Sequence, residues 1–270
     1  MLQVLRCYYL PLVFHHPLKL SSFITKTSST RQTLLSTLRS LGYITLELLI
    51  TPLQYGIPNS RLRYYLLAKQ YPLQYSGLGG IQKDTILRHI PGQADWVDPR
   101  IDSTNINGDG LSISGNPINK LKDYLDGDVV NNEPHPHAVP EKVLQKWGRL
   151  FDIVLPSSRR TCCFTRGYTQ LVERAGSILQ ENDNLNTTEI FDKFFQAQSE
   201  ADPRALEILK PLRLRYFSPI ELLRLFHFIP LGTPSVFSWP EGVSTKTKYR
   251  LIGNSVNVEV VERLIEYLFQ

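Results

Sequence analysis

The last segment of the chain constrains the fold more than any other, because it has strong helical periodicity. The opposite sides of the expected helix differ: Glu259, Glu262, Arg263 and Glu266 lie on one, and an apolar stripe of Val256, Val260, Val261, Leu264, Ile265 and Leu268 lies on the other. A helix of this kind buries its stripe against another layer of structure. The rest of the sequence must therefore supply a sheet or a second helix to cover it.

Two short apolar segments near the start of the chain predict β-strands. They cover Leu46 to Ile50 and Arg61 to Ala68, and a loop punctuated by Pro and Gly separates them. We expect these strands to pair as an antiparallel ribbon. A helix is predicted before them, capped at Ser28 to Thr30 and ending before Gly42, with apolar positions Leu34, Leu35, Leu38 and Leu41.

The middle of the chain has little periodicity. Residues 71 to about 141 are rich in Gly, Pro, Asn and Asp, so we expect a loop-rich region that is partly mobile at Asn131 to Val139. Beyond it, the pattern predicts a strand over Cys162 to Thr165 and helices over Val143 to Leu150, Ile190 to Gln198, Ala205 to Leu209 and Pro219 to Phe226.

Charge is distributed unevenly along the 270 residues. The formal net charge is +5, yet residues 1–70 hold eight Lys or Arg and a single acid, Glu47, so the other 200 residues sum to −2. A basic first segment is typical of a surface that binds a polyanion such as nucleic acid. An ordinary solvated surface is the alternative. With 42% hydrophobic residues, the chain can bury one core or divide into a larger and a smaller domain.

The cysteines and the N-terminal segment bear on the compartment. Cys7, Cys162 and Cys163 lack the spacing of a disulfide framework or a zinc site, which favours a reducing compartment. Leu2 to Phe14 is apolar like a signal peptide, but Pro11 interrupts it and no clean cleavage site follows. No segment approaches the roughly 20 apolar residues of a membrane span.

Two arginines on the second predicted strand are candidate binding residues. Arg61 and Arg63 are two residues apart, so a strand would project both guanidinium groups from one face. Rigid paired donors suit a base edge or a phosphate. An exposed strand with two solubilising arginines is the alternative.

Cys163-Phe164-Thr165 lies among cations and an aromatic ring. Arg159 and Arg160 precede it, and Arg166 and Tyr168 follow it. Such a mixture suits nucleic acid, with cations on phosphates and rings on bases. Cys163 is either a reactive thiol beside cations or a buried apolar filler.

Two further motifs have ordinary explanations. Gly253-Asn254-Ser255 is predicted to open the last helix, where Asn or Ser caps free N–H groups. His135 and His137 lie between prolines without other ligands nearby, which favours a linker over a metal site.

Taken together, several segments resemble the DNA (cytosine-5) methyltransferase family and, within it, the tRNA-aspartate cytosine-5 methyltransferases. The resemblance runs in family order over about 240 residues. Its segments are Ser28 to Arg31, Tyr55 to Tyr64, Arg159 to Tyr168, Leu214 to Pro219 and Tyr249 to Val258. It implies an α/β fold, the remnant of a Rossmann-like S-adenosylmethionine-dependent methyltransferase domain with a smaller, loop-rich target-recognition domain.

The resemblance also implies a domain organisation. Residues 28–70 and 211–270 would form the C-terminal part of the catalytic domain, and residues 71–210 would form the target-recognition domain. Residues 1–27 would be an atypical or replaced N-terminus. The apolar stripe of the last helix would then lose part of its cover, which predicts poor solubility or marginal stability.

In this family a cysteine thiolate attacks C6 of a flipped cytosine, and C5 then takes a methyl group from S-adenosylmethionine. The resemblance implies that Arg61 and Arg63 border the target-base pocket. It places Asn254, Ser255 and Val256 at the cofactor pocket. Substrate-binding positions would be Arg160, Cys163, Phe164, Thr165 and Tyr168.

Three family features are missing from these 270 residues: the cysteine that follows a proline, the Glu-Asn-Val segment and the glycine-rich cofactor loop. Our first hypothesis is a shortened, inactive tRNA methyltransferase, cytoplasmic or nuclear, that needs no metal. Its partners would be tRNA, with DNA as the alternative, and a separate N-terminal half. A non-catalytic RNA-binding remnant or complementing half is the second hypothesis, and a plain interaction module is the third.

Overall fold

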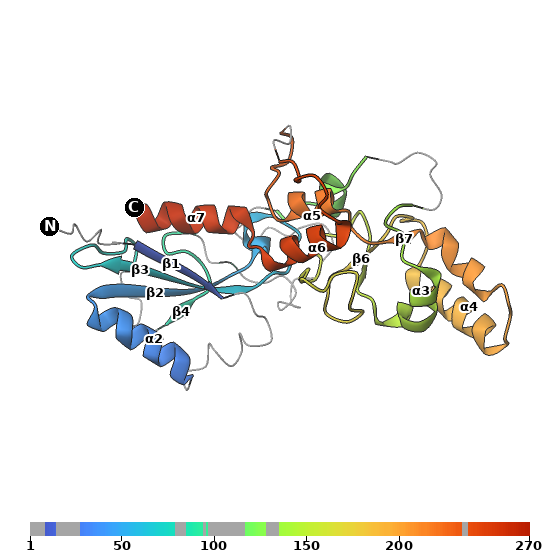
Figure 1. Cartoon of the computed structure of the whole chain (residues 1–270), viewed down its shortest axis with the longest axis horizontal. Helices are drawn as coiled ribbons and strands as arrows, with labels where there is room; N and C mark the ends of the chain where they lie inside the picture. The colour runs from blue at the N-terminus through green and yellow to red at the C-terminus, as the bar shows by residue number, and fades with distance from the viewer. Residues whose placement is uncertain are drawn as a thin grey trace. The chain divides into compact units, whose positions relative to one another are not determined.

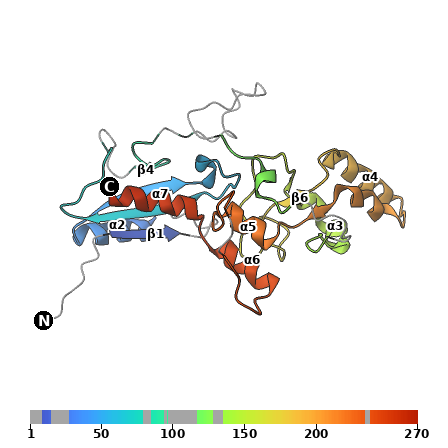
Figure 2. The ribbon, with the colours of Figure 1, turned by 90° about the horizontal axis from the view of Figure 1, so that it is seen from above.

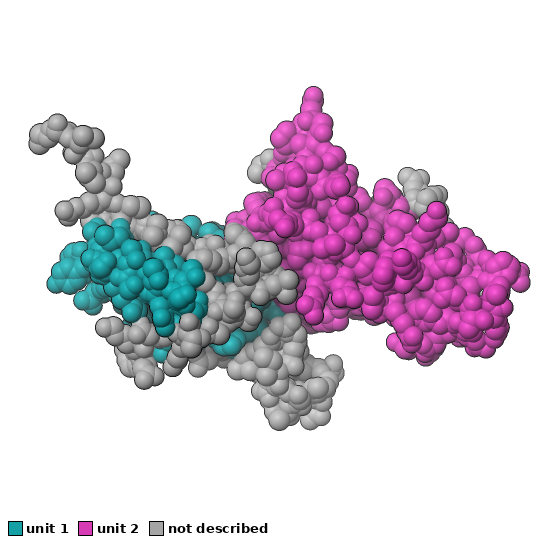
Figure 3. Space-filling view, turned by 60° about the horizontal axis from the view of Figure 1, so that its bottom comes forward, with its two compact units in different colours: residues 1–56, 62–117, 259–270 teal, residues 57–61, 118–258 magenta. Residues whose placement is uncertain are grey.

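The computed structural model divides into two compact units (Figure 3). Unit 1 comprises residues 1–56, 62–117 and 259–270, and unit 2 comprises residues 57–61 and 118–258. The structure describes residues 28–78, 85–93, 96, 117–127, 135–233 and 237–270, together with the backbone of 9–14. About half of the segment predicted to be loop-rich between 71 and 141, including the first part of the predicted mobile stretch Asn131 to Val139, lies outside these ranges. The family-based domain assignment stays a prediction.

Unit 1 is built on a four-stranded sheet in the order β1-β3-β2-β4. The strands are β1 (Tyr9–Phe14), β2 (Tyr43–Ile50), β3 (Arg63–Gln70) and β4 (Ile86–Leu87). β2 and β3 are antiparallel, with Ile50 opposite Arg63, so the predicted ribbon is confirmed. The connecting loop holds one 3-10 turn, η1 (Pro52–Tyr55). β1 is an edge strand, where Pro11 is tolerated although it has no backbone N–H.

Helix α7 (Val258–Phe269) covers one face of this sheet (Figure 1). Its buried residues Val260, Leu264 and Leu268 pack with alternate residues of the two central strands: Leu46, Leu48 and Ile50 of β2, and Tyr65 and Leu67 of β3. Alternation in a strand sends every second side chain to the same face. The expected loss of cover is therefore wrong for these three stripe residues, while Ile265 is 40% exposed.

Helix α2 (Ser29–Ser40) covers the opposite face, as Figures 1 and 2 show. Ser28 is its N-cap, and the Ser28 side chain accepts a hydrogen bond from the backbone N–H of Arg31. The apolar side of α2 packs on the remaining alternate residues of the sheet. The cluster consists of Leu35, Leu38, Leu49, Tyr64 and Leu66. Unit 1 is thus an α/β/α sandwich, in agreement with the predicted fold class.

An ion pair is buried beneath α2. Arg31 donates from Nε and Nη2 to the two carboxylate oxygens of Glu47, at 2.5 and 2.8 Å. The hydroxyl of Tyr64 donates to the same carboxylate at 2.7 Å. Because charged groups are costly to bury unless they are paired and hydrogen-bonded, each of these three groups depends on the other two.

Unit 2 contains a small sheet in the order β5-β6-β7. Its strands are β5 (Ile153–Val154), β6 (Ile178–Gln180) and β7 (Leu214–Arg215). The helices are η3 (Leu121–Tyr124), α3 (Glu141–Trp147), η4 (Gly148–Leu150), α4 (Thr187–Ser199), η5 (Ala205–Leu212), α5 (Pro219–Leu225) and α6 (Thr245–Asn254). None of the described helices is long and apolar enough to cross a membrane.

Two sequence-based predictions about unit 2 are wrong. Cys162 to Thr165 is not a strand: Ser177 Oγ accepts from the Cys162 N–H at 2.8 Å, and a single backbone bond, from the Thr165 N–H to the Ala175 carbonyl, does not make a ladder. Gly253 to Ser255 does not open the last helix. It ends α6, whose N-cap is Ser244, and the Ser255 N–H binds the carbonyl of Ile252.

We expect Glu47→Ala to destabilise unit 1 strongly. The change leaves the Arg31 guanidinium and the Tyr64 hydroxyl buried without their shared acceptor, and breaking a buried pair costs about 3–5 kcal/mol. Amide hydrogen exchange in β2 and β3 measures the loss. Glu266→Ala is the matched control, because Glu266 forms an exposed pair with Arg263 and such pairs contribute at most about 1 kcal/mol. Equal effects of the two variants would contradict the argument.

Candidate functional site

Arg61 is the centre of the candidate site and lies entirely within unit 2. Its side chain is 1% exposed. Nη1 donates to the carbonyl of Phe164 at 2.7 Å and to the sulfur of Cys163 at 3.4 Å. Nη2 donates to the carbonyls of Gly253 and Ser255, at 3.1 and 2.5 Å. The guanidinium also lies over the ring of Phe226, 4.7 Å from its centroid.

Asn59 and Thr161 make a second link between the same segments. Both are fully buried. The Asn59 amide donates to Thr161 Oγ1 at 2.9 Å and to the Cys162 carbonyl at 3.2 Å, and Thr161 Oγ1 donates to the Pro58 carbonyl. The Ser60 N–H binds the Thr161 carbonyl at 3.0 Å. The loop 58–61 is thereby bound residue by residue to the segment that leads into Cys163.

Gly253 brings the third segment into direct contact. A Cβ at this position would lie 2.2–2.3 Å from backbone atoms of Thr165 and Arg166. Such a distance is shorter than real side chains allow, so only glycine permits this approach. We call the assembly of residues 58–61, 161–166 and 253–255 the three-segment hub. Sequence reasoning quoted all three segments but missed Asn59, Thr161 and the packing role of Gly253.

Phe164 and Tyr168 are core residues of unit 2. Phe164 is fully buried, with its ring edge-on to those of Tyr168 and Phe217. The Tyr168 hydroxyl donates to the Ser177 carbonyl at 2.8 Å and accepts from the Phe217 N–H at 2.9 Å. Neither ring is free to stack on a base in this arrangement. Thr165 is half-buried beside them, and its hydroxyl accepts from the Gly167 N–H.

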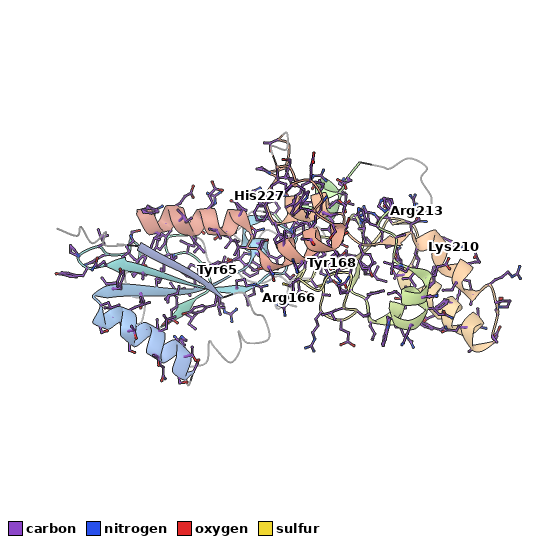
Figure 4. The ribbon with its side chains drawn as sticks, in the orientation of Figure 1. Tyr65, Arg166, Tyr168, Lys210, Arg213 and His227 are labelled. Carbon is purple, nitrogen blue, oxygen red and sulfur yellow. The ribbon has the colours of Figure 1, made fainter. Side chains whose placement is uncertain are left out.

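Two exposed cations lie at the hub: Arg166, which belongs to it, and Arg160, which directly precedes Thr161 (Figure 4 labels Arg166 and Tyr168). Arg160 donates to Asp152 at 2.8 Å, and Asp152 also accepts from the Ser177 hydroxyl at 2.5 Å. Arg166 follows the Cys-Phe-Thr segment directly and projects from the surface of unit 2. These two residues retain the predicted ability to meet phosphates.

Arg63 belongs to unit 1, whereas Arg61 belongs to unit 2. Arg63 is the first residue of β3 and is 3% exposed, and its Nη1 donates to the Leu62 carbonyl at 2.9 Å. Arg61 precedes the strand. The assumption that both residues share one strand face is therefore not met, and their role at a target-base pocket stays a prediction.

Of the three residues predicted to close the cofactor pocket, Ser255 is hydrogen-bonded to other groups of unit 2. Ser255 Oγ donates to the Ile252 carbonyl at 2.6 Å, and the Ser255 carbonyl accepts from Arg61. Asn254 is exposed at the end of α6, and Val256 is half-buried. These three residues do not by themselves form a cradle for S-adenosylmethionine.

The two cysteines of the hub have different surroundings. Burial raises the pKa of the Cys162 thiol to about 12, with the Asp152 carboxylate adding to the shift. The sulfur of Cys163 lies beside the Arg61 guanidinium. Within the described part of the chain, no group of three or more His, Cys, Asp or Glu residues is arranged to hold a metal ion.

Comparison with known proteins identifies the family. Residues 22–270 match C-5 cytosine-specific DNA methylase. The tRNA (cytosine(38)-C(5))-methyltransferase of Homo sapiens is 32% identical over 91% of this chain, and that of Schizosaccharomyces pombe is 36% identical over 86%. This chain covers 68% and 57% of their respective lengths.

Solved structures agree with this result. The crystal structure of a Spodoptera frugiperda DNMT2 mutant superposes with a TM-score of 0.71 at 29% identity, over 97% of this chain and 66% of that one. S. pombe Dnmt2 methyltransferase gives a TM-score of 0.64 at 31% identity, with coverages of 97% and 66%. The chain belongs to the C-5 cytosine-specific DNA methylase family, and the predicted resemblance is confirmed.

We expect Gly253→Ala to disrupt the three-segment hub. The new methyl group would meet backbone atoms of Thr165 and Arg166, which cannot rotate away as a side chain would. Overpacking costs about 1–3 kcal/mol and more where the neighbour is rigid. Gly127→Ala is the matched control, because nothing lies within 4 Å of its added Cβ. Hydrogen exchange in unit 2 should rise only in the first variant; unchanged exchange there would refute the close approach.

We expect the Cys162 thiol to react slowly with iodoacetamide at pH 8. The thiolate is the reactive form, and a pKa raised to about 12 leaves the folded protein with the neutral thiol until the pH approaches that value. The rate should therefore rise about tenfold per pH unit between pH 7 and 10. Mass spectrometry of the peptide that spans Thr161 to Arg166 distinguishes the two cysteines. Cys162 in denaturant is the control, and equal rates in the folded and denatured chains would contradict burial.

Proposed function

We propose that this chain is part of a tRNA cytosine-5 methyltransferase and carries its target-recognition region. The reaction of such an enzyme moves a methyl group from S-adenosylmethionine to C5 of a cytosine in tRNA. The names of the human and S. pombe relatives support tRNA as the substrate and cytosine 38 as the target. The observation that carries the proposal is the three-segment hub, which joins Arg61, Cys163 and Gly253 by direct contacts.

In this proposal Arg61 is a positioning residue. Its donors bind the backbone of the Cys-Phe-Thr segment and the end of α6, so it fixes the loop from which Arg160 and Arg166 project. The two exposed guanidinium groups then contact phosphates of the RNA, and phosphate contacts set the register of a nucleic acid. DNA is the alternative polyanion for the same groups. A cytoplasmic or nuclear location follows from a tRNA substrate.

Catalysis by the 270 residues alone is not part of the proposal. None of the three cysteines follows a proline, and the raised pKa of the half-buried Cys162 keeps its thiol neutral near pH 7. We propose that the nucleophile and the main cofactor contacts come from a further segment or a partner chain. The second candidate function is a non-catalytic RNA-binding module, favoured by a hub whose three segments all lie in unit 2.

We expect the purified chain to bind a tRNA transcript with strong salt dependence. Each phosphate contact contributes a slope of about −0.7 to −0.9 in a plot of log affinity against log salt concentration. Arg166→Ala should therefore lower the magnitude of this slope by about one. Lys193→Ala, an exposed cation on α4, is the control that should leave it unchanged. Fluorescence anisotropy over a salt series measures the slope.

A methyl-transfer assay on the same samples separates the candidate functions. With radiolabelled S-adenosylmethionine and tRNA, the chain alone should incorporate no label above background. Incorporation of label by the chain alone would overturn the proposal that a further segment or a partner chain supplies the nucleophile. Binding that is absent or independent of salt would count against both candidate functions.

A further inference from the structure

Unit 2 contains a pocket of about 340 Å³ that the three-segment hub does not use. Three of its lining residues carry aromatic rings: His137, Tyr216 and Tyr249. Lys246 adds a cation, and Ala138 lies at an exposed point of the wall. The volume is that of a site for a small organic group. The sequence pattern around His137 had indicated only a linker.

The ring-bearing wall is held by specific contacts. The Tyr249 hydroxyl donates to the Phe217 carbonyl at 2.8 Å and lies 3.3 Å from His137 Nδ1. The Tyr216 N–H donates to the His137 carbonyl at 2.9 Å. The buried ring of Tyr168 stands edge-on to both Tyr216 and Tyr249, with centroids 5.4 Å away in each case. The wall is therefore preformed and backed by the aromatic core of unit 2.

The charge of the pocket is positive. Lys246 lies in the first turn of α6, and this turn holds no acidic residue. None of the described residues that line the pocket is Asp or Glu. Thr169 and Thr245 add hydroxyl groups at the wall. A single pocket thus combines aromatic rings, hydroxyl groups and one cation.

This combination matches the chemistry of a nucleotide. Aromatic side chains stack on unstacked bases, and lysine neutralises a phosphate. An uncharged apolar ligand would gain nothing from the lysine, and inorganic phosphate alone would gain nothing from the rings. We propose that this pocket binds one unstacked nucleotide, with its base against Tyr216 and His137 and its phosphate at Lys246, while Tyr249, 4% exposed, supports the wall.

The nucleotide comes either from a single-stranded part of a bound RNA or from a free mononucleotide. The first source rests on the proposed function and adds a second point of recognition beside the phosphate contacts of Arg160 and Arg166. The second source, a free mononucleotide, does not depend on the proposed function. Both share a base and a phosphate, so one set of variants tests both.

Two variants change the pocket without touching its hydrogen-bonded wall. Ala138→Trp fills the space from an exposed position, and Lys246→Glu reverses the charge. Lys193→Glu is the matched charge control, because Lys193 is exposed on α4 and does not line the pocket. Hydrogen exchange of the Tyr168 and Phe217 amides verifies that each variant keeps its core.

The probes are a tRNA transcript with 4-thiouridine for cross-linking, CMP, and inorganic phosphate as a control. We expect cross-links to the peptides that hold Tyr216 and Tyr249. Ala138→Trp should lower the affinity about tenfold, since stacking of one base accounts for a factor of this size, and Lys246→Glu should lower it by removing the phosphate contact. Lys193→Glu should retain the cross-links. Saturation-transfer NMR should detect CMP, and phosphate should not replace it.

The outcomes separate this inference from the proposed function. If the tRNA binds the wild-type chain but cross-links elsewhere, and CMP is not detected, the pocket does not bind a nucleotide even though the proposed function stands. If tRNA does not bind but CMP does and Ala138→Trp abolishes it, the proposed function fails and the pocket takes a free nucleotide. If neither probe responds to the two pocket variants, the inference is overturned.

Discussion

The buried guanidinium of Arg61 is the interaction on which the arrangement of unit 2 depends. A charged group removed from water is tolerated only when polar partners replace its hydration. The partners here are three carbonyls and a thiol, drawn from segments about 100 and 190 residues away in the sequence. The carbonyls of Phe164 and Ser255 belong to irregular backbone and that of Gly253 to the last turn of α6, so the Arg61 side chain links segments that no sheet joins. The three segments therefore form one structural element although no strand or helix unites them.

The parts of the fold that the sequence predicts are those set by local periodicity. Alternation along β2 sends Leu48 to α7 and Leu49 to α2, and this two-sided burial is visible in the sequence as a continuous apolar run. The stripe of α7 and the Ser28 cap of α2 are local signals of the same kind. The family resemblance implied that absent segments cover part of the α7 stripe, whereas β2 and β3 bury Val260 and Leu264 within unit 1.

The sequence identifies the segments of the candidate site but not the contacts between them. Cys162 to Thr165 has the composition of a strand, yet its backbone binds mainly the side chains of Asn59, Arg61 and Ser177, which no periodicity reveals. The sequence pattern predicted a helix cap at Gly253. Its actual requirement is the approach of α6 to the Thr165–Arg166 peptide, and that requirement arises only from tertiary structure.

The same geometry limits how this chain can recognise a substrate. Both terminal nitrogens of Arg61 already donate to four acceptors, so a base contact would have to break bonds that hold the Cys-Phe-Thr segment. Phe164 and Tyr168 are likewise committed to the core. Recognition must therefore rely on side chains that the buried network holds in place but does not use in its own contacts. Arg166, which is exposed next to the close approach of Gly253, and Tyr216, which is half-buried against the ring of Tyr168, meet that condition.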